Sequence, residues 1–181
     1  MSYLYKDIVQ LAYQGLRAAN IPHDAAAETA LFLALAEVDG LASHGLARVA
    51  QYCRHAKHDR INIHAQVKTQ CYKTACALVD GQDGLAFPAL KHATDLSVKL
   101  ASQNGVGLVA IKNTHHFGVA GHYTEAAARA GYISLLLGNT PAAMPMAGGT
   151  KAVFGTNPLA IAFPVPGKEP LVIDMSLSRS E

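Results

Sequence analysis

The hydrophobic pattern of this 181-residue chain changes near residue 60. Before that point apolar residues recur at the 3.6-residue spacing of amphipathic helices, as in the run from Ile8 to Ala19. From Ile61 onward, short apolar runs typical of strands alternate with one long and one short helical segment. This order predicts an α+β fold, with a helical subdomain over residues 1–60 and an α/β region over 61–181.

Turn residues divide the pattern into separate elements. Asn20-Ile21-Pro22 and Asp39-Gly40 end two helices, Asp24 is a candidate cap for the second, and Asp80-Gly81-Gln82-Asp83-Gly84 has the composition of a turn. We expect helices over 8–19, 25–38, 43–58, 87–103 and 121–130, and strands over 63–67, 73–79, 106–111, 132–137, 152–154, 159–165 and 171–175.

Charge and composition exclude several classes of function. The net charge is +2 without a basic cluster, which argues against nucleic-acid binding. The apolar runs are too short to cross a bilayer, and the first residues lack the apolar core of a secretory signal. The three cysteines have no CxxC spacing, so we interpret them as reduced thiols of a cytoplasmic protein. A hydrophobic content of 50% favours a buried subunit interface.

The segment Ser43-His44-Gly45-Leu46-Ala47-Arg48 places an imidazole and a guanidinium four residues apart. On a continuous helix His44 and Arg48 would share one face. Arg48 can bind a carboxylate through two parallel hydrogen bonds, and His44 can donate a proton to an atom that becomes electron-rich. Reduction of a 2-oxo or 2-imino acid by hydride needs that pair. The alternative is an ordinary surface pair.

The stretch Gly105-Val106-Gly107-Leu108-Val109-Ala110 matches the GxGxxA dinucleotide fingerprint only as a string. The fingerprint leaves a strand and begins a helix, whereas this stretch follows a helix and enters a strand. We interpret it as a helix stop followed by a strand.

The loop from Asn113 to Gly121 follows a predicted strand and precedes a helix, which is where α/β proteins place binding sites. Gly118 and Gly121 allow the backbone to approach a ligand closely, and the helix N-terminus can bind phosphate. A polar loop without a ligand is the alternative. A metal site at His115, His116 and His122 is less favoured, because adjacent histidines in an extended loop point to opposite sides and no carboxylate lies nearby in sequence.

Two later segments carry polar groups beside turns. Thr156 and Asn157 suit a substrate carboxylate or a ribose, or they are turn residues only. Asp174 ends a strand, where its carboxylate either binds ribose hydroxyls or caps the segment that follows.

Together these motifs resemble one family. Ser43-His44-Gly45 with Arg48, then His116-Phe117-Gly118, Gly155-Thr156-Asn157-Pro158 and Ile173-Asp174-Met175-Ser176 occur in this order in the malate/L-lactate dehydrogenase family. These NAD(P)-dependent oxidoreductases lack a Rossmann domain, and their members reduce 2-oxo acids and cyclic 2-imino acids. The resemblance covers nearly the whole chain and implies a helical subdomain joined to a non-Rossmann α/β domain, in a homodimer.

The resemblance also implies a role for each matching residue. His44 is implied as the catalytic acid/base, with Ser43 beside it able to orient the ring or to relay through a hydrogen bond. Arg48 and Thr156 are implied as substrate-binding residues. The implied NAD or NADP contacts are His116, Phe117, Gly118, Asp174, Met175 and Ser176. No metal is implied.

The family runs to about twice this length, so we expect an incomplete α/β domain with an exposed apolar edge near Leu171 to Met175. Cofactor-binding segments that follow Ser178 in the family are then missing. Two hypotheses follow. The chain is a truncated NAD(P)H-dependent reductase of a 2-oxo or cyclic 2-imino acid, or it is a non-catalytic remnant or interaction subunit that requires a complementary chain.

Overall fold

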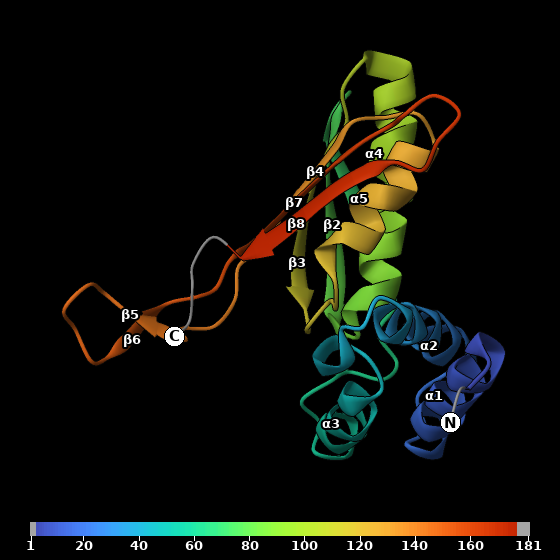
Figure 1. Cartoon of the computed structure of the whole chain (residues 1–181), viewed down its shortest axis with the longest axis vertical. Coiled ribbons are helices and arrows are strands. Elements are labelled where there is room, and N and C mark those ends of the chain that lie inside the picture. The colour runs from blue at the N-terminus through green and yellow to red at the C-terminus, as the bar shows by residue number, and fades with distance from the viewer. Residues whose placement is uncertain (1–2, 177–181) are drawn as a thin grey trace. The chain divides into compact units, whose positions relative to one another are not determined.

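The computed structural model of the chain describes residues 3–176 (Figure 1). It divides into two compact units, Met1–Val119 and Ala120–Glu181. Both units contain helices and small sheets, which confirms the predicted α+β class. The predicted helical subdomain, residues 1–60, forms only the first half of the first unit, and its status as a separate domain stays a prediction. Within residues 3–176 no helix is long and apolar enough to cross a membrane.

The first unit begins with helices that pack through small and aliphatic side chains. Ala12 and Leu16 are fully buried where α1 lies against α2, and Tyr52 is buried on α3. Asp24 lies in the first turn of α2, and Pro22 rather than Asp24 occupies the cap position. The elements are α1 (Tyr5–Ala18), α2 (His23–Val38), the 3₁₀ turn η1 (Ala42–His44) and α3 (Ala47–Lys57).

The prediction of one helix over residues 43–58 was wrong at its beginning. The backbone leaves helical geometry at Gly45, with φ −96° and ψ −137°, and α3 starts only at Ala47. Glu37 of α2 explains the break, because its carboxylate accepts the Leu46 N–H at 2.6 Å and occupies the space where a side chain on residue 45 would lie. A carboxylate at a helix N-terminus satisfies an N–H that has no partner within the helix.

The sheet of the first unit has the order β1-β2-β3 and is covered by one helix. β1 (Lys68–Lys73) pairs antiparallel with β2 (Cys76–Gly84), and β2 pairs parallel with β3 (Leu108–Thr114). The crossover helix α4 (Ala86–Asn104) connects β2 to β3 and buries Ala89 and Ala93 against Val79. Gly105 ends α4 with φ +78°, so the GxGxxA string is a helix stop followed by a strand, as predicted.

Two sequence expectations for this sheet were wrong. The strand expected over 63–67 lies at 68–73, where every residue is exposed and no apolar alternation signals a strand. The turn expected over 80–84 is the end of β2, and Gln82 and Asp83 adopt left-handed backbone conformations there. Asp80 stabilises this irregular end by accepting the Gln82 N–H at 2.9 Å and an Asn113 N–H at 3.1 Å. These hydrogen bonds hold the pKa of the Asp80 carboxyl well below its usual range.

The second unit is an antiparallel sheet with one helix on one face. The order is β4-β7-β8, and Ala160 and Ala162 of β7 are fully buried on the face that α5 covers. A two-stranded ribbon, β5 with β6, projects from it (Figure 1). The elements are α5 (Ala120–Arg129), β4 (Ser134–Leu137), β5 (Met144–Pro145), β6 (Ala152–Phe154), β7 (Pro158–Phe163) and β8 (Leu171–Ser176).

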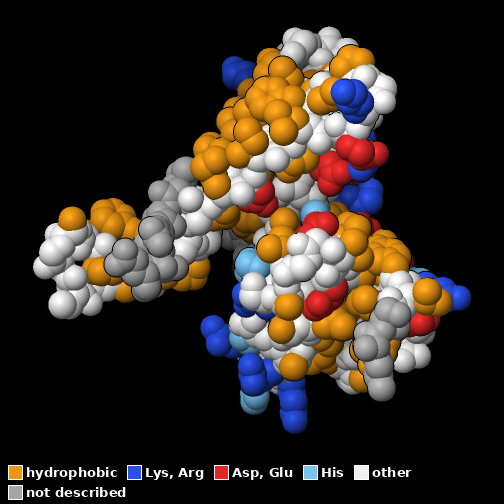
Figure 2. All heavy atoms as spheres, viewed as in Figure 1, with side chains coloured by type: hydrophobic (Ala, Val, Ile, Leu, Met, Phe, Trp, Pro, Cys, Tyr) orange, Lys and Arg blue, Asp and Glu red, His pale blue; other side chains and the backbone are white. Residues whose placement is uncertain are grey.

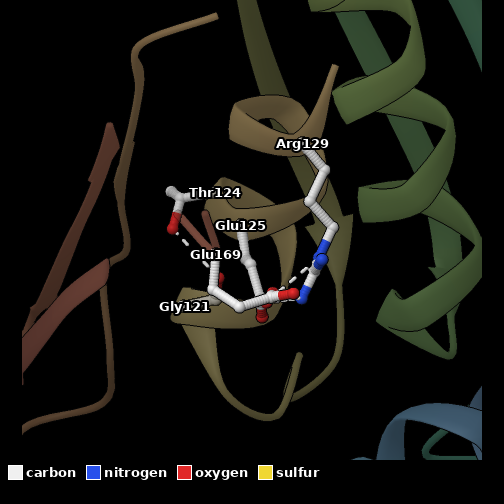
Figure 3. A network of polar contacts seen from close by, with 5 residues as sticks. All are labelled: Gly121, Thr124, Glu125, Arg129 and Glu169. Atoms are coloured by element: carbon white, nitrogen blue, oxygen red, sulfur yellow. Dashed lines mark hydrogen bonds and ion pairs between the residues drawn. The ribbon is translucent and has the colours of Figure 1, made fainter. Parts of the chain in front are cut away.

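Polar contacts fix both ends of α5 (Figure 3). Thr124 donates its hydroxyl to the Gly121 carbonyl at 3.0 Å near the start of the helix. Arg129, in the last turn, forms ion pairs with Glu125 and with Glu169, which precedes β8. The pair with Glu169 joins the end of the helix to the segment that leads into the edge strand.

Within the second unit, the described residues leave the other face of this sheet apolar and without a covering element. The register places Leu135, Ile161 and Ile173 side by side, and Leu137, Leu159 and Met175 in the next row. Figure 2 shows hydrophobic side chains gathered over this sheet. The exposed members are Leu135 (58%), Leu137 (66%), Leu171 (55%), Ile173 (38%) and Met175 (46%). They expose on the order of 500 Å², the upper range for one patch on a monomer.

Candidate active site

Ser43 and His44 lie on η1, immediately before the break at Gly45. The Ser43 hydroxyl and the Nδ1 atom of His44 are 3.0 Å apart and share a hydrogen bond. That contact restrains the rotation of the imidazole ring. Because Nδ1 is engaged by Ser43, proton exchange with a ligand falls to the other ring nitrogen, Nε2.

Arg48 lies in the first turn of α3, so it does not share a helix with His44 as the sequence predicted. Its Nε donates to the Ser43 carbonyl oxygen at 2.6 Å, and its Nη1 donates to Gln51 Oε1 at 2.8 Å. The first contact ties the guanidinium to the turn that carries His44. A guanidinium has five N–H donors, so these two bonds hold its plane and leave further donors for a carboxylate.

His116 contacts both η1 and α3. Its ring centroid is 5.4 Å from that of His44, and its Nδ1 is 2.7 Å from the Tyr52 hydroxyl of α3. Burial lowers the pKa of His116 to about 3, and the positive charge at Arg48 and the neighbouring His44 and His115 act in the same direction. His116 is therefore neutral at physiological pH.

Tyr52 is the residue that sequence reasoning missed. It is fully buried, and its ring contacts Phe87 of α4 at a centroid distance of 6.0 Å. Burial raises the pKa of its phenol, which the nearby Arg48 partly opposes. The available signal was its spacing: Tyr52 lies four residues after Arg48, and on a helix that spacing places two side chains on one face.

His115 binds a different partner from His116. Its Nε2 is 2.8 Å from His55 Nδ1 on α3, and its own Nδ1 is buried and has no hydrogen-bond partner among the described residues. Burial, together with His55 and two arginines, lowers the pKa of His115. In the part of the chain that the structure describes, no group of three or more histidine, cysteine or acidic side chains is placed to hold a metal ion.

Phe117 and Gly118 complete this loop. The Phe117 ring stacks on His116 at an interplanar angle of 18°. Gly118 has φ +75°, and a Cβ there would lie 2.9 Å from the Phe87 ring. The glycine is thus required by protein packing, because only glycine adopts this conformation without strain beside an aromatic ring. Its contact with a cofactor stays a prediction.

In the second unit, Thr156 and Asn157 connect two loops. The hydroxyls of Thr156 and Thr140 are 3.2 Å apart, and Asn157 Oδ1 accepts the Thr140 N–H at 3.1 Å. The Ser176 hydroxyl donates to the Thr156 carbonyl at 3.1 Å. The structure therefore brings the predicted residues Thr156 and Ser176 together at the end of β8.

Asp174 lies on β8 and reaches the start of α5. Its Oδ2 accepts the Gly121 N–H at 2.7 Å, and a Cβ on Gly121 would lie 3.1 Å from that oxygen. A carboxylate of the protein therefore binds the N–H that the sequence suggested for phosphate, and Asp174 acts as a cap. Met175, the next residue, is 46% exposed.

The capping bond gives a prediction for stability. Asp174→Ala is expected to lower the free energy of unfolding by about 1 kcal/mol, the usual cost of a lost helix cap, and Asp174→Asn, which keeps an acceptor oxygen, by less. Urea unfolding followed by circular dichroism measures both. Asp95→Ala is the control, because its ion pair with Lys91 is exposed and contributes little. An unchanged free energy of unfolding in Asp174→Ala would show that the bond does not stabilise α5.

Each unit thus brings together some of the site residues that the sequence predicted. In the first unit pairwise contacts link Arg48 to Ser43, Ser43 to His44, His44 to His116 and His116 to Tyr52. In the second, Ser176 bonds to Thr156 on the strand that carries Asp174 and Met175. A half-buried histidine beside an arginine and a neutral, buried histidine is an arrangement suited to proton transfer to a bound anion.

Known proteins are similar to this chain in sequence and in fold. The chain is 42% identical over 169 residues to (2R)-3-sulfolactate dehydrogenase (NADP(+)) of Chromohalobacter salexigens, covering 93% of this chain and 50% of that protein. It superimposes on sulfolactate dehydrogenase from Methanocaldococcus jannaschii with a TM-score of 0.90 and 35% identity, covering 97% of this chain and 51% of that one. For Δ1-piperideine-2-carboxylate reductase from Pseudomonas syringae the TM-score is 0.85 and the identity 28%, with 97% and 53% covered.

The chain spans about half the length of the curated relatives it matches. Within that half the correspondence is continuous, since the sequence profile of one family matches residues 4–181. The match confirms the resemblance carried by the four motifs. The chain belongs to the malate/L-lactate dehydrogenase family.

Proposed function

We propose that the chain forms the proton-donating and carboxylate-binding part of an NAD(P)H-dependent oxidoreductase that reduces a 2-oxo acid or a cyclic 2-imino acid. The observation that carries the proposal is the convergence of His44, Arg48 and a neutral His116 in the first unit. Substrates of both kinds have a carboxylate next to the carbon that accepts hydride, and both need a proton at the neighbouring oxygen or nitrogen.

Arg48 would bind the substrate carboxylate. Its bonds to the Ser43 carbonyl and to Gln51 orient the guanidinium before substrate arrives, which lowers the entropic cost of binding. The planar group then offers two parallel N–H donors to the two carboxylate oxygens. Thr156 of the second unit stays a proposed substrate contact.

His44 would deliver the proton. As the carbonyl or imine carbon accepts hydride, its double bond opens and the electron pair moves to the oxygen or nitrogen. His44 Nε2 donates a proton to that atom and leaves a neutral imidazole. Ser43, bonded to Nδ1 at 3.0 Å, orients the ring during this transfer.

The residues present fit a dinucleotide cofactor, which supplies the hydride when bound. Asp174 uses Oδ2 for the Gly121 N–H, and its Oδ1 can accept a ribose hydroxyl. Met175 gives an exposed apolar surface beside the Ser176 hydroxyl. We propose these three residues of the second unit as cofactor contacts and, separately, His116, Phe117 and Gly118 of the first unit. NAD and NADP both remain candidates; the sulfolactate dehydrogenase relative is named for NADP(+).

The relatives indicate the range of substrates to test. Their names cover sulfolactate, malate, 2,3-diketo-L-gulonate and Δ1-piperideine-2-carboxylate. All are small acids or their reduced products, in keeping with the Arg48 and His44 pair. We also propose a homodimer, because the apolar face of β4, β7 and β8 needs a partner, and a cytoplasmic location, because Cys53, Cys71 and Cys76 are free thiols.

The same apolar face favours a second candidate function, a non-catalytic interaction subunit. Leu135, Ile173 and Met175 would then bind a polypeptide carrying the remaining half of the family's length. Such a partner buries the exposed side chains and completes the domain.

The two candidates differ in what the 181-residue chain does alone. We expect the chain by itself to show no saturable NADH or NADPH binding and no turnover, because half of a pocket leaves the cofactor solvated. Adding a polypeptide that supplies the family's second half is expected to restore both. Fluorescence titration, with assays on pyruvate and piperideine-2-carboxylate, measures these properties.

Each outcome separates the alternatives. Turnover on addition of the second half supports the reductase. Binding of that polypeptide without turnover on any substrate of the relatives supports the interaction subunit. Tight cofactor binding and turnover by the chain alone would contradict the need for a complementary polypeptide.

A further inference from the structure

The Nδ1 atom of His116 receives two polar contacts. The Tyr52 hydroxyl lies at 2.7 Å, and the backbone N–H of Gly118 donates to the same atom at 3.3 Å. All three residues belong to the first unit. The contacts come from α3 on one side and from the His116 loop itself on the other.

The amide settles the direction of both contacts. A backbone N–H only donates, so a nitrogen that accepts from it must present its lone pair and carry no proton. The Tyr52 hydroxyl, which can donate or accept, must then donate to the same lone pair. A neutral imidazole carries one proton, and this leaves it on Nε2.

We infer that Tyr52 and the Gly118 amide hold His116 in the Nε2–H tautomer, so that this ring is a neutral hydrogen-bond donor beside His44 and Arg48. Tyr52 is thus a positioning residue that acts through His116. Its own position is rigid, because the side chain is fully buried and its ring contacts Phe87 and His115.

The tautomer gives His116 a role distinct from that of His44. A neutral N–H stabilises developing negative charge without transferring its proton, whereas an imidazolium would compete with His44 as the acid. The ligand atom that Nε2–H would serve is an oxygen acceptor on the substrate or cofactor. That use rests on the proposed function, but the tautomer itself does not.

The surroundings keep the ring neutral. Arg48 on α3, His44 on η1 and His115 in the same loop face His116, and each positive charge there opposes protonation. The Tyr52 hydroxyl acts in the same direction, since a donor bound to the lone pair of Nδ1 stabilises the unprotonated nitrogen. Removing that hydroxyl should therefore raise the pKa of His116.

The experiment is nitrogen-15 NMR of the full chain labelled at histidine, without ligand. In the wild-type chain His116 is expected to show a pyrrole-type Nε2 and a pyridine-type Nδ1, unchanged between about pH 5 and pH 8. Tyr52→Phe keeps the ring and removes the hydroxyl. It is expected to move the Nδ1 signal toward that of a more weakly hydrogen-bonded nitrogen, because only the Gly118 amide still donates to it, and to mix the tautomers.

Tyr13→Phe is the matched control, because the Tyr13 hydroxyl makes the same kind of contact with His23 Nδ1 at 2.8 Å on the exposed surface. It should change the nitrogen signals of His23 and leave those of His116 unaltered. A proton on His116 Nδ1 in the wild-type chain would overturn the inference. An unchanged His116 spectrum in a folded Tyr52→Phe chain would remove Tyr52 from the positioning role.

Substrate kinetics form a separate arm, measured on any preparation that turns over. Tyr52→Phe is expected to lower kcat severalfold with a smaller effect on KM, because the donor matters most as charge develops. If NMR shows the inferred tautomer but no substrate is turned over, the result contradicts the proposed function and leaves this inference intact. The reverse result, turnover with the opposite tautomer, would count against this inference only.

Discussion

His44→Ala is expected to lower kcat by about 10²-fold or more, the usual contribution of a positioned general acid. The alanine enzyme must take its proton from water, which is neither oriented nor held by Ser43. KM should change little, because Arg48 keeps the carboxylate contact. Steady-state reduction of a 2-oxo acid by NAD(P)H, on the chain combined with a polypeptide that supplies the family's second half, measures both constants.

His58→Ala is the control for this substitution. His58 lies at the C-terminal end of α3, is exposed, and should leave kcat unchanged. Ordinary turnover by a folded His44→Ala enzyme across neutral pH would exclude His44 as the acid. His116 would then be the next candidate, although its low pKa keeps it unprotonated at neutral pH.

Arg48→Lys is expected to raise KM by about tenfold or more, on the order of 1–3 kcal/mol for a hydrogen bond to a charged group. An ammonium group has no planar pair of donors and cannot bind both carboxylate oxygens in parallel. It also loses the bonds to Ser43 and Gln51 that orient the guanidinium. The increase should be largest for substrates that offer Arg48 only their carboxylate.

Two controls separate binding from local structure. Arg54→Lys changes an exposed arginine of the same helix and should leave KM unaltered. Gln51→Ala removes only the contact with Nη1, so it reports how much of the effect comes from orientation. An unchanged KM in Arg48→Lys for every 2-oxo and 2-imino acid tested would leave Arg48 as a structural residue of α3.

Most elements could be predicted from the sequence where burial imposes a period. Residues 87–103 and 159–165 carry apolar patterns set by burial, and α4 and β7 lie there. The pattern failed at β1, whose residues are all exposed, because an exposed edge strand has no apolar alternation. It failed again at Gly45, because Glu37 of the preceding helix α2 bonds to the Leu46 N–H, a contact that the apolar period does not encode.

The order of four short motifs identified the family, since four motifs in one order are far more specific than any one of them alone. The sequence by itself thus determined the α+β class, the family and the residues to consider. Only the tertiary structure showed that Asp174 caps α5 and that Tyr52, 64 positions before His116, bonds to its ring. Both facts depend on distances between segments far apart in the chain, and local periodicity carries no information on such distances.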